Sequence, residues 1–317
     1  MQISTEACVV RTQRKLLIAA QVVLATVLVW FPVRLLAVRW HDVQWRASDL
    51  RLRWDVIALS CGIVLFAYAL LIQAWRTVVR GWGSRLDYRD AARIWTISNL
   101  GRYVPGKVWQ LGTMAVMARQ HGVSGLVAAG SALVVTVVNL VAGLVVAAVT
   151  GADVFGLSPW AVGAVGVLAA GTLLGPSVLP RVIQLVARAT GREVVAPQLP
   201  MRAVVVAALS SVAAWVLYGL AFRELAAGVL GSAPGALSLY VAVFTSSYLL
   251  GFLALFAPGG VGVREVAMAT ALARAGVDVA SAAILVVTSR LWLTVLEVVP
   301  ALVFLAHLGV RHQGRHA

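Results

Sequence analysis

Long apolar runs alternate along this chain with short segments rich in arginine. Runs of about 20 apolar residues are long enough to cross a bilayer as helices. The first run follows a short basic segment, but it is longer than the apolar core of a signal peptide, so we interpret it as an uncleaved span. The pattern therefore predicts an all-α polytopic membrane protein with about six spanning helices, at residues 16–38, 56–75, 126–150, 160–179, 203–226 and 279–308.

Two further regions, 91–120 and 237–275, are apolar overall but interrupted in the middle. A break in a helix frees backbone polar groups, which lipid cannot satisfy, so it is tolerated only beside protein or a water-filled cavity. Each region is long enough for two half-helices, and we predict that each forms a re-entrant helical hairpin. The residues of the predicted helix breaks are Pro105, Gly106, Pro258, Gly259 and Gly260.

The basic clusters set the expected orientation in the membrane. Cytoplasmic loops carry an excess of Arg and Lys, which places both termini and the segment 76–93 in the cytoplasm. The two hairpins then enter from opposite faces, and their breaks approach each other near the midplane, an arrangement that transporters use. We expect one transmembrane domain over residues 1–317, with a cytoplasmic tail at 1–15 and a basic tail at 309–317.

Composition supports a membrane protein over a soluble one. Hydrophobic residues make up 61% of the chain and charged residues only 12%, whereas soluble domains are about a quarter charged. The formal net charge of +14 would suggest nucleic acid as a partner of a soluble protein. Here we attribute it to cytoplasmic helix ends and expect no nucleic-acid binding, because no basic recognition motif is present. The expected location is the cell membrane.

The first predicted break carries two cations, Arg102 and Lys107. The half-helix that follows would present free N–H groups and the positive end of its dipole, which favour anions. This arrangement predicts a binding site for a lipid phosphate. The alternative is a re-entrant loop whose cations extend to the cytoplasmic interface.

The second predicted break is followed by Arg264 and Glu265. The glutamate complements the dipole of the next half-helix, and Arg264 is either its ion-pair partner or a second phosphate ligand. Arg290 and Glu297 lie seven residues apart on one face of the last predicted span. Charges at membrane depth are costly and indicate function by default. We expect both to face the interior and to meet the hairpins, either in a site or as an interhelical salt bridge.

Catalytic motifs are not evident in the sequence. There is no Ser/His/Asp arrangement, no paired-carboxylate motif and no metal-ligand spacing. The segment from Gly101 to Lys107 resembles a nucleotide-binding loop, but Val108 stands where that loop needs Ser or Thr. We therefore expect no catalytic residues, no metal and no cofactor, and a transporter in place of an enzyme.

Both breaks resemble signatures of a known family. Asn99-x-Gly101-Arg102-Tyr103-x-Pro105-Gly106-Lys107-x-Trp109-Gln110 resembles the first signature of the lysylphosphatidylglycerol synthase transmembrane-region family, also called flippase-like. Pro258-Gly259-Gly260-x-Gly262-x-Arg264-Glu265 is similar to the second. The resemblance runs from the first predicted span to the last, and we expect a stand-alone member without the soluble aminoacyl-transferase domain. It implies that the motif residues Arg102, Lys107, Arg264 and Glu265 line a pocket.

Three hypotheses follow. The first is a lipid translocase (a flippase or scramblase) for a phospholipid or a polyprenyl-phosphate-linked head group. In it, Arg102, Lys107 and Arg264 bind the phosphate, while Glu265, Arg290 and Glu297 are charge partners. The second is an integral membrane transferase acting on polyprenyl-phosphate sugars. The third is a non-transporting scaffold for a membrane glycosyltransferase. Membrane lipids are the expected partners, with a membrane glycosyltransferase or lipid-modifying enzyme as an additional one.

Overall fold

The computed structural model describes residues 52–103, 108–190, 199–254 and 257–313, and all regular structure in these ranges is helical. The predicted first span at 16–38, the tail at 1–15 and the residues Pro105, Gly106 and Lys107 lie outside them. The elements are α3 (Trp54–Gly81), α4 (Tyr88–Asn99), the 3₁₀ helix η1 (Leu100–Tyr103), α5 (Val108–Arg119), α6 (Gly125–Phe155), α7 (Pro159–Thr190), α8 (Met201–Leu230), α9 (Leu237–Leu253), the 3₁₀ helix η2 (Pro258–Gly260), α10 (Val263–Arg274) and α11 (Val279–Gln313).

Four of the described helices are long and apolar enough to cross a membrane: α3, α6, α8 and α11. They coincide with four of the predicted spans. The predicted span at 160–179 corresponds to helix α7, whose apolar portion at Pro159–Gly175 is shorter. The predicted all-α membrane fold is thus confirmed. Helix α11 continues to Gln313, so its last turns extend into the segment that the sequence assigned to the basic tail.

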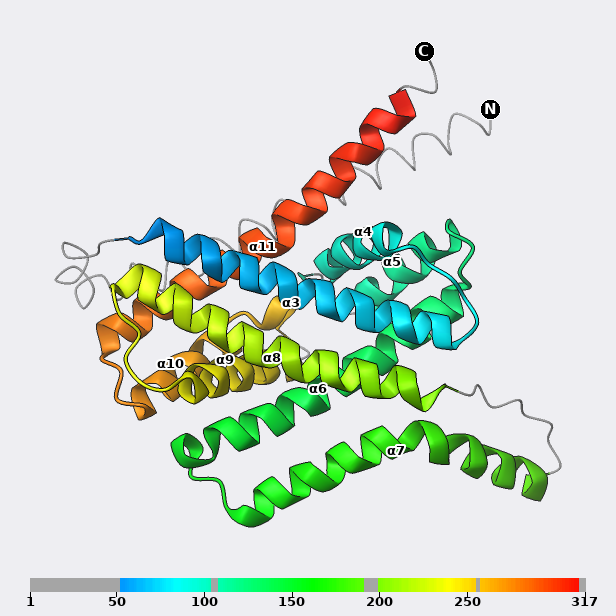
Figure 1. Ribbon diagram of the computed structural model, residues 1–317, viewed down its shortest axis with the longest axis horizontal. Coiled ribbons are helices and arrows are strands. Elements are labelled where there is room, and N and C mark those ends of the chain that lie inside the picture. The colour runs from blue at the N-terminus through cyan, green and yellow to red at the C-terminus, as the bar shows by residue number, and fades with distance from the viewer. Residues whose placement is uncertain (1–51, 104–107, 191–198, 255–256, 314–317) are drawn as a thin grey trace, which may run out of the picture.

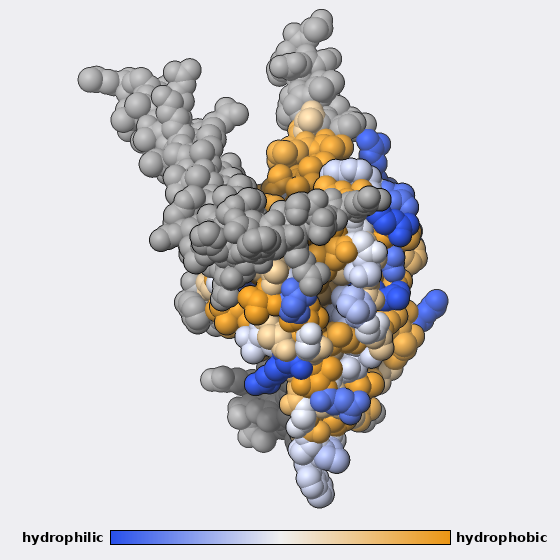
Figure 2. Space-filling view, turned by 90° about the vertical axis from the view of Figure 1, so that its left-hand side faces the viewer, coloured by the Kyte–Doolittle hydropathy of each residue, from blue (hydrophilic) through white to orange (hydrophobic). Residues whose placement is uncertain are grey.

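The long helices α3 and α8 run side by side in opposite directions across the molecule (Figure 1). Small residues allow this close approach. A Cβ atom added to Gly228 would lie 2.7 Å from Cγ1 of Ile57, and the hydroxyl of Ser60 donates a hydrogen bond to the carbonyl oxygen of Ala221 at 2.7 Å. Figure 2 views the end at which α3 begins, where hydrophilic residues are interspersed with hydrophobic ones.

The two hairpins approach each other from opposite ends of the bundle. Helices α4 and α5 lie beside the end of α3, and α9 and α10 lie toward the other end of the molecule (Figure 1). Their tips, η1 and η2, are in contact. A Cβ atom on Gly259 would lie 2.9 Å from a ring carbon of Tyr103, so glycine is needed where the tips meet. The described parts of the two interrupted regions therefore meet at η1 and η2, while their entry from opposite faces of the membrane stays a prediction.

The second break depends on glycine in another way. Helix α9 ends at Leu253 and α10 begins at Val263, with left-handed backbone at Gly259, Gly260 and Gly262 between them. Side chains disfavour that conformation. In addition, a Cβ atom on Gly260 would lie only 2.7 Å from the carbonyl oxygen of Gly251. The break can therefore pack its backbone directly against α9.

Candidate functional site

A cavity of about 360 Å³ lies where the tips of the two hairpins meet α3, α6, α8 and α11. The polar groups of its wall come from segments far apart in the sequence, including Tyr68 of α3, Asn139 of α6 and Tyr248 of α9. Most of the remaining lining is apolar or aromatic. The charged side chains among its described lining residues are Arg102, Arg264, Arg290 and Glu297.

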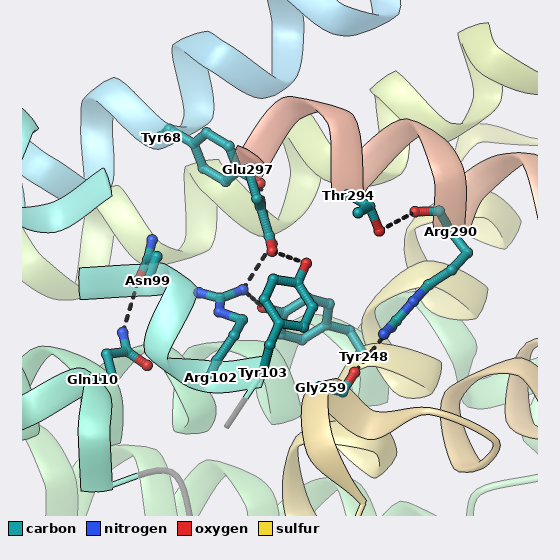
Figure 3. Close-up of polar contacts among 10 residues, drawn as sticks. All are labelled: Tyr68, Asn99, Arg102, Tyr103, Gln110, Tyr248, Gly259, Arg290, Thr294 and Glu297. Atoms are coloured by element: carbon teal, nitrogen blue, oxygen red, sulfur yellow. Dashed lines mark hydrogen bonds and ion pairs between the residues drawn. The ribbon is translucent and has the colours of Figure 1, made fainter. Parts of the chain in front are cut away.

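Glu297 is the most heavily bonded of these charged groups. Its side chain is only 6% exposed and extends from α11 toward η1 (Figure 3). Its carboxylate accepts a hydrogen bond from Nη1 of Arg102 at 2.8 Å and another from the hydroxyl of Tyr103. The hydroxyl of Tyr68 is a third donor at 3.5 Å. These bonds attach the tip of the first hairpin to the last span and compensate the buried negative charge.

Arg102 also connects the two hairpins. The same Nη1 atom lies 2.7 Å from the hydroxyl oxygen of Tyr248 on α9, which accepts its hydrogen bond. The guanidinium thus contacts a residue of the opposite hairpin and a residue of α11 at once. It points into the bundle, so the alternative in which this cation extends to the cytoplasmic interface is wrong for Arg102.

Arg290 attaches the second hairpin to α11. Its Nη1 donates a hydrogen bond to the carbonyl oxygen of Gly259 at 2.9 Å (Figure 3), which satisfies a backbone acceptor at the break. Its Nε lies 3.6 Å from Oε1 of Glu265, an ion pair in which the two side chains are 5% and 4% exposed. Glu265 in turn accepts a hydrogen bond from the backbone N–H of Gly262 at 2.7 Å.

These contacts correct one alternative from the sequence. The ion-pair partner of Glu265 is Arg290 from another span, and not its neighbour Arg264. Adjacent residues of a helix point in different directions, so a pair that is close in sequence is not the pair that forms. Glu265 does complement the start of α10, as its position near the helix N-terminus predicted.

Arg264 is left as a buried cation without a carboxylate partner among the described residues. The residue is 6% exposed, and its Nη2 is buried without a hydrogen-bond partner. The guanidinium carbon lies 5.1 Å and 5.0 Å from the ring centres of Phe244 and Tyr248. These two rings are four residues apart on one face of α9. Cation–π contacts stabilise the charge partly, but they leave the Nη2 donor without a hydrogen-bond partner.

Residues 18–301 match the family model described as the lysylphosphatidylglycerol synthase TM region. The chain belongs to this family. No curated protein and no solved structure matches the chain. Membership agrees with the resemblance of the two break motifs and with the polytopic helical fold.

In this member of the lysylphosphatidylglycerol synthase TM family, the structure gathers four of the six predicted charged site residues around one cavity. Glu265 is placed behind the wall, where it contacts Arg290. Lys107 lies outside the described residues. Residues that the sequence did not single out also belong to the site: Tyr68, Phe244 and Tyr248 contact the charged groups directly. An aromatic residue in an apolar run carries no signal of such a role, because most aromatic residues there only fill space.

A smaller cavity of about 150 Å³ adjoins the first in this family member. Both cavities share Tyr68, Trp95, Asn99 and Glu297 in their walls. Asn99 accepts a hydrogen bond from the side-chain amide of Gln110 at 2.7 Å, which links the two arms of the first hairpin (Figure 3). Glu297 therefore stands in the partition between two cavities.

Proposed function

We propose that the protein is a lipid translocase of the cell membrane, which moves a phosphate-bearing lipid head group through the cavity between its two hairpins. The observation that carries this proposal is Arg264, a buried guanidinium at the cavity wall with an unpartnered Nη2. Guanidinium groups bind phosphate through paired N–H donors. A lipid phosphate would supply both the negative charge and the acceptor oxygens that the described residues do not.

Energetics favour an anionic occupant. A buried charge at membrane depth costs several kcal/mol unless it is paired or hydrated, and among the described residues Arg264 has cation–π contacts with two rings but no ion pair. The N-terminus of α10 begins one residue earlier, at Val263, and adds the positive end of a helix dipole. Both features favour an anion beside Arg264, and Glu265 already accepts the hydrogen bond of the Gly262 N–H at this helix end.

The other predicted residues support the phosphate or hold the site together. Arg102 has an Nε atom without a hydrogen-bond partner, so it can contribute a second contact while Glu297 keeps its Nη1. Lys107 follows the same break motif and would add a further positive charge. Glu265, Arg290 and Glu297 keep the net charge near the cavity low and attach the hairpins to α11.

The opposed hairpins supply a route for movement. In transporters, interrupted helices that meet near the midplane place a site between two gates, and small rocking motions expose it to each side in turn. Here the two tips are held by separate contacts from one helix, Glu297 to η1 and Arg290 to η2. The proposed mechanism is that these contacts loosen alternately while the head group stays on Arg264.

The test is movement of acyl-labelled anionic phospholipid in vesicles that contain the purified full chain. Arg264→Ala should slow transbilayer movement at least about tenfold, because a charge-assisted hydrogen bond contributes roughly 1.5–3 kcal/mol. Arg274→Ala is the matched control, since Arg274 is an exposed arginine in the last turn of the same helix. Equal rates in wild type, Arg264→Ala and Arg274→Ala would refute the proposal.

A further inference from the structure

Among the described residues, the charged groups around the cavity leave one positive charge in excess, and Lys107 of the first break motif would add to it. Three arginines, Arg102, Arg264 and Arg290, face two glutamates among the described residues at the site. Both carboxylates are already engaged, Glu297 by Arg102 and Glu265 by Arg290 and the Gly262 N–H. An anionic occupant offsets this positive excess. An ammonium group on the head group would have to compete with Arg102 or Arg290 for a carboxylate.

Two of the aromatic rings at the site already hold a cation. Phe244 and Tyr248 already carry the guanidinium of Arg264. Trp215 packs edge-on against Tyr248, with ring centres 5.4 Å apart, and donates its indole N–H to the carbonyl oxygen of Asn139. At the ring faces of Phe244 and Tyr248, a ligand cation would therefore compete with the guanidinium of Arg264.

Neutral polar groups at the same wall lack partners. The side-chain oxygen Oδ1 of Asn139 and the indole Nε1 of Trp95 are both buried, and neither has a hydrogen-bond partner. Such unpaired buried groups are uncommon and costly. One is an acceptor and the other a donor, and a hydroxyl can satisfy either, because it both donates and accepts. The cavity of about 360 Å³ lies in the size range of small-molecule sites.

We propose that the cavity selects phosphodiester lipids with a hydroxylated, uncharged head group, such as glycerol or a cyclitol, over lipids with an amine. This inference rests on the proposed function and specifies its substrate class. Arg264 would bind the phosphate, and Asn139 and Trp95 would bind head-group hydroxyls. Selection then has two separable parts, one for charge and one for hydroxyl groups.

The test compares lipids with identical labelled acyl chains in vesicles that contain the full chain. The lipids are phosphatidylglycerol, phosphatidylinositol, phosphatidylmethanol, phosphatidylethanolamine and a lysyl ester of phosphatidylglycerol. We expect one or both hydroxylated anionic lipids to move about tenfold faster than the two amine-bearing lipids. Phosphatidylmethanol has the charge without the hydroxyl groups and should be intermediate. The faster of the two hydroxylated lipids identifies the head-group size.

The variant Asn139→Leu separates hydroxyl binding from a general loss of activity. It removes Oδ1 but keeps the backbone carbonyl that Trp215 uses. It should slow phosphatidylglycerol several-fold and leave phosphatidylmethanol unchanged. If amine-bearing lipids move as fast or faster, in an Arg264-dependent way, the selectivity is refuted and translocation stands. If no lipid moves in an Arg264-dependent way, the proposed function fails and the selectivity fails with it.

Discussion

Glu297 and Arg102 are 195 residues apart in the chain, and their side chains form an ion pair at 2.8 Å between the last span and the first hairpin. Seven residues earlier on the same helix, Arg290 bonds to the tip of the second hairpin. Positions seven residues apart share a helix face. Helix α11 therefore contacts both broken hairpins from one face, and any movement of one tip relative to the other must change one of these two contacts.

Replacing Glu297 with alanine should destabilise the protein strongly. The substitution leaves the partly buried Arg102 without its carboxylate partner. Breaking a buried ion pair in this way costs about 3–5 kcal/mol. Glu297→Gln should cost less, because the single amide oxygen can still accept the hydrogen bond from Arg102, while the amide NH2 group then faces the hydroxyl of Tyr103. Thermal unfolding of the detergent-purified protein measures both. Equal midpoints for wild type and Glu297→Ala would show that this pair does not hold the hairpin.

The double variant Arg102→Met with Glu297→Leu provides the control for that prediction. Apolar replacement of both members of a buried pair is often neutral for stability. We therefore expect the unfolding midpoint to recover most of what Glu297→Ala loses, while lipid movement stays low because the Arg102 donors are gone. A double variant no more stable than Glu297→Ala would mean that the lost stability has another source.

Lysine should not replace arginine at position 290. The guanidinium bonds to the carbonyl of Gly259 with one nitrogen and lies beside Glu265 with another, and a single ammonium cannot reproduce this fork. Arg290→Lys should lower stability by about 1–3 kcal/mol and reduce lipid movement. Arg223→Lys is a suitable comparison, because Arg223 forms a more exposed pair with Glu224 and should tolerate the change. If Arg290→Lys kept the stability and the lipid-movement rate of the wild type, the role of the Arg290 guanidinium in holding Gly259 and Glu265 would be contradicted.

A single methyl group at Gly260 should disrupt the second break. The added Cβ would lie 2.7 Å from the carbonyl oxygen of Gly251. The alanine would also have to keep the backbone φ of +71° that Gly260 adopts. The matched control is Gly276→Ala, where φ is +78° but no atom lies within 4 Å of the new Cβ. The control should lose only the backbone term, about 1–2 kcal/mol, and Gly260→Ala clearly more. Thermal unfolding compares the two, and equal losses would show that close packing of the break is unimportant.

Tyr248 has two functions that substitutions can separate. Its hydroxyl accepts a hydrogen bond from Arg102, and its ring lies under the guanidinium of Arg264. Tyr248→Phe removes only the first contact and should lower lipid movement slightly. Tyr248→Leu removes both and should lower it several-fold further, because a desolvated cation–π contact contributes up to about 2 kcal/mol. Identical rates in the two variants would show that the ring does not support Arg264.

Much of the fold follows from the order of apolar and polar residues alone. Long apolar runs must become helices in a bilayer, because no water is available to satisfy their backbone groups. The same constraint makes a Pro-Gly interruption, such as the one at Pro258 and Gly259, indicate a hairpin with protein around it. For these reasons the spans at α3, α6, α8 and α11 and the second break could be located without coordinates.

The pairing of charges was decided only by the tertiary structure. Sequence patterns identified Arg102, Arg264, Glu265, Arg290 and Glu297 as unusual, because charges are rare in apolar segments. They could not show that Arg290 selects Glu265 or that Glu297 selects Arg102. Contacts between spans depend on helix rotation and depth, which result from packing over the whole bundle. Those same contacts are what leave Arg264 without a carboxylate partner among the described residues, and hence define the proposed site.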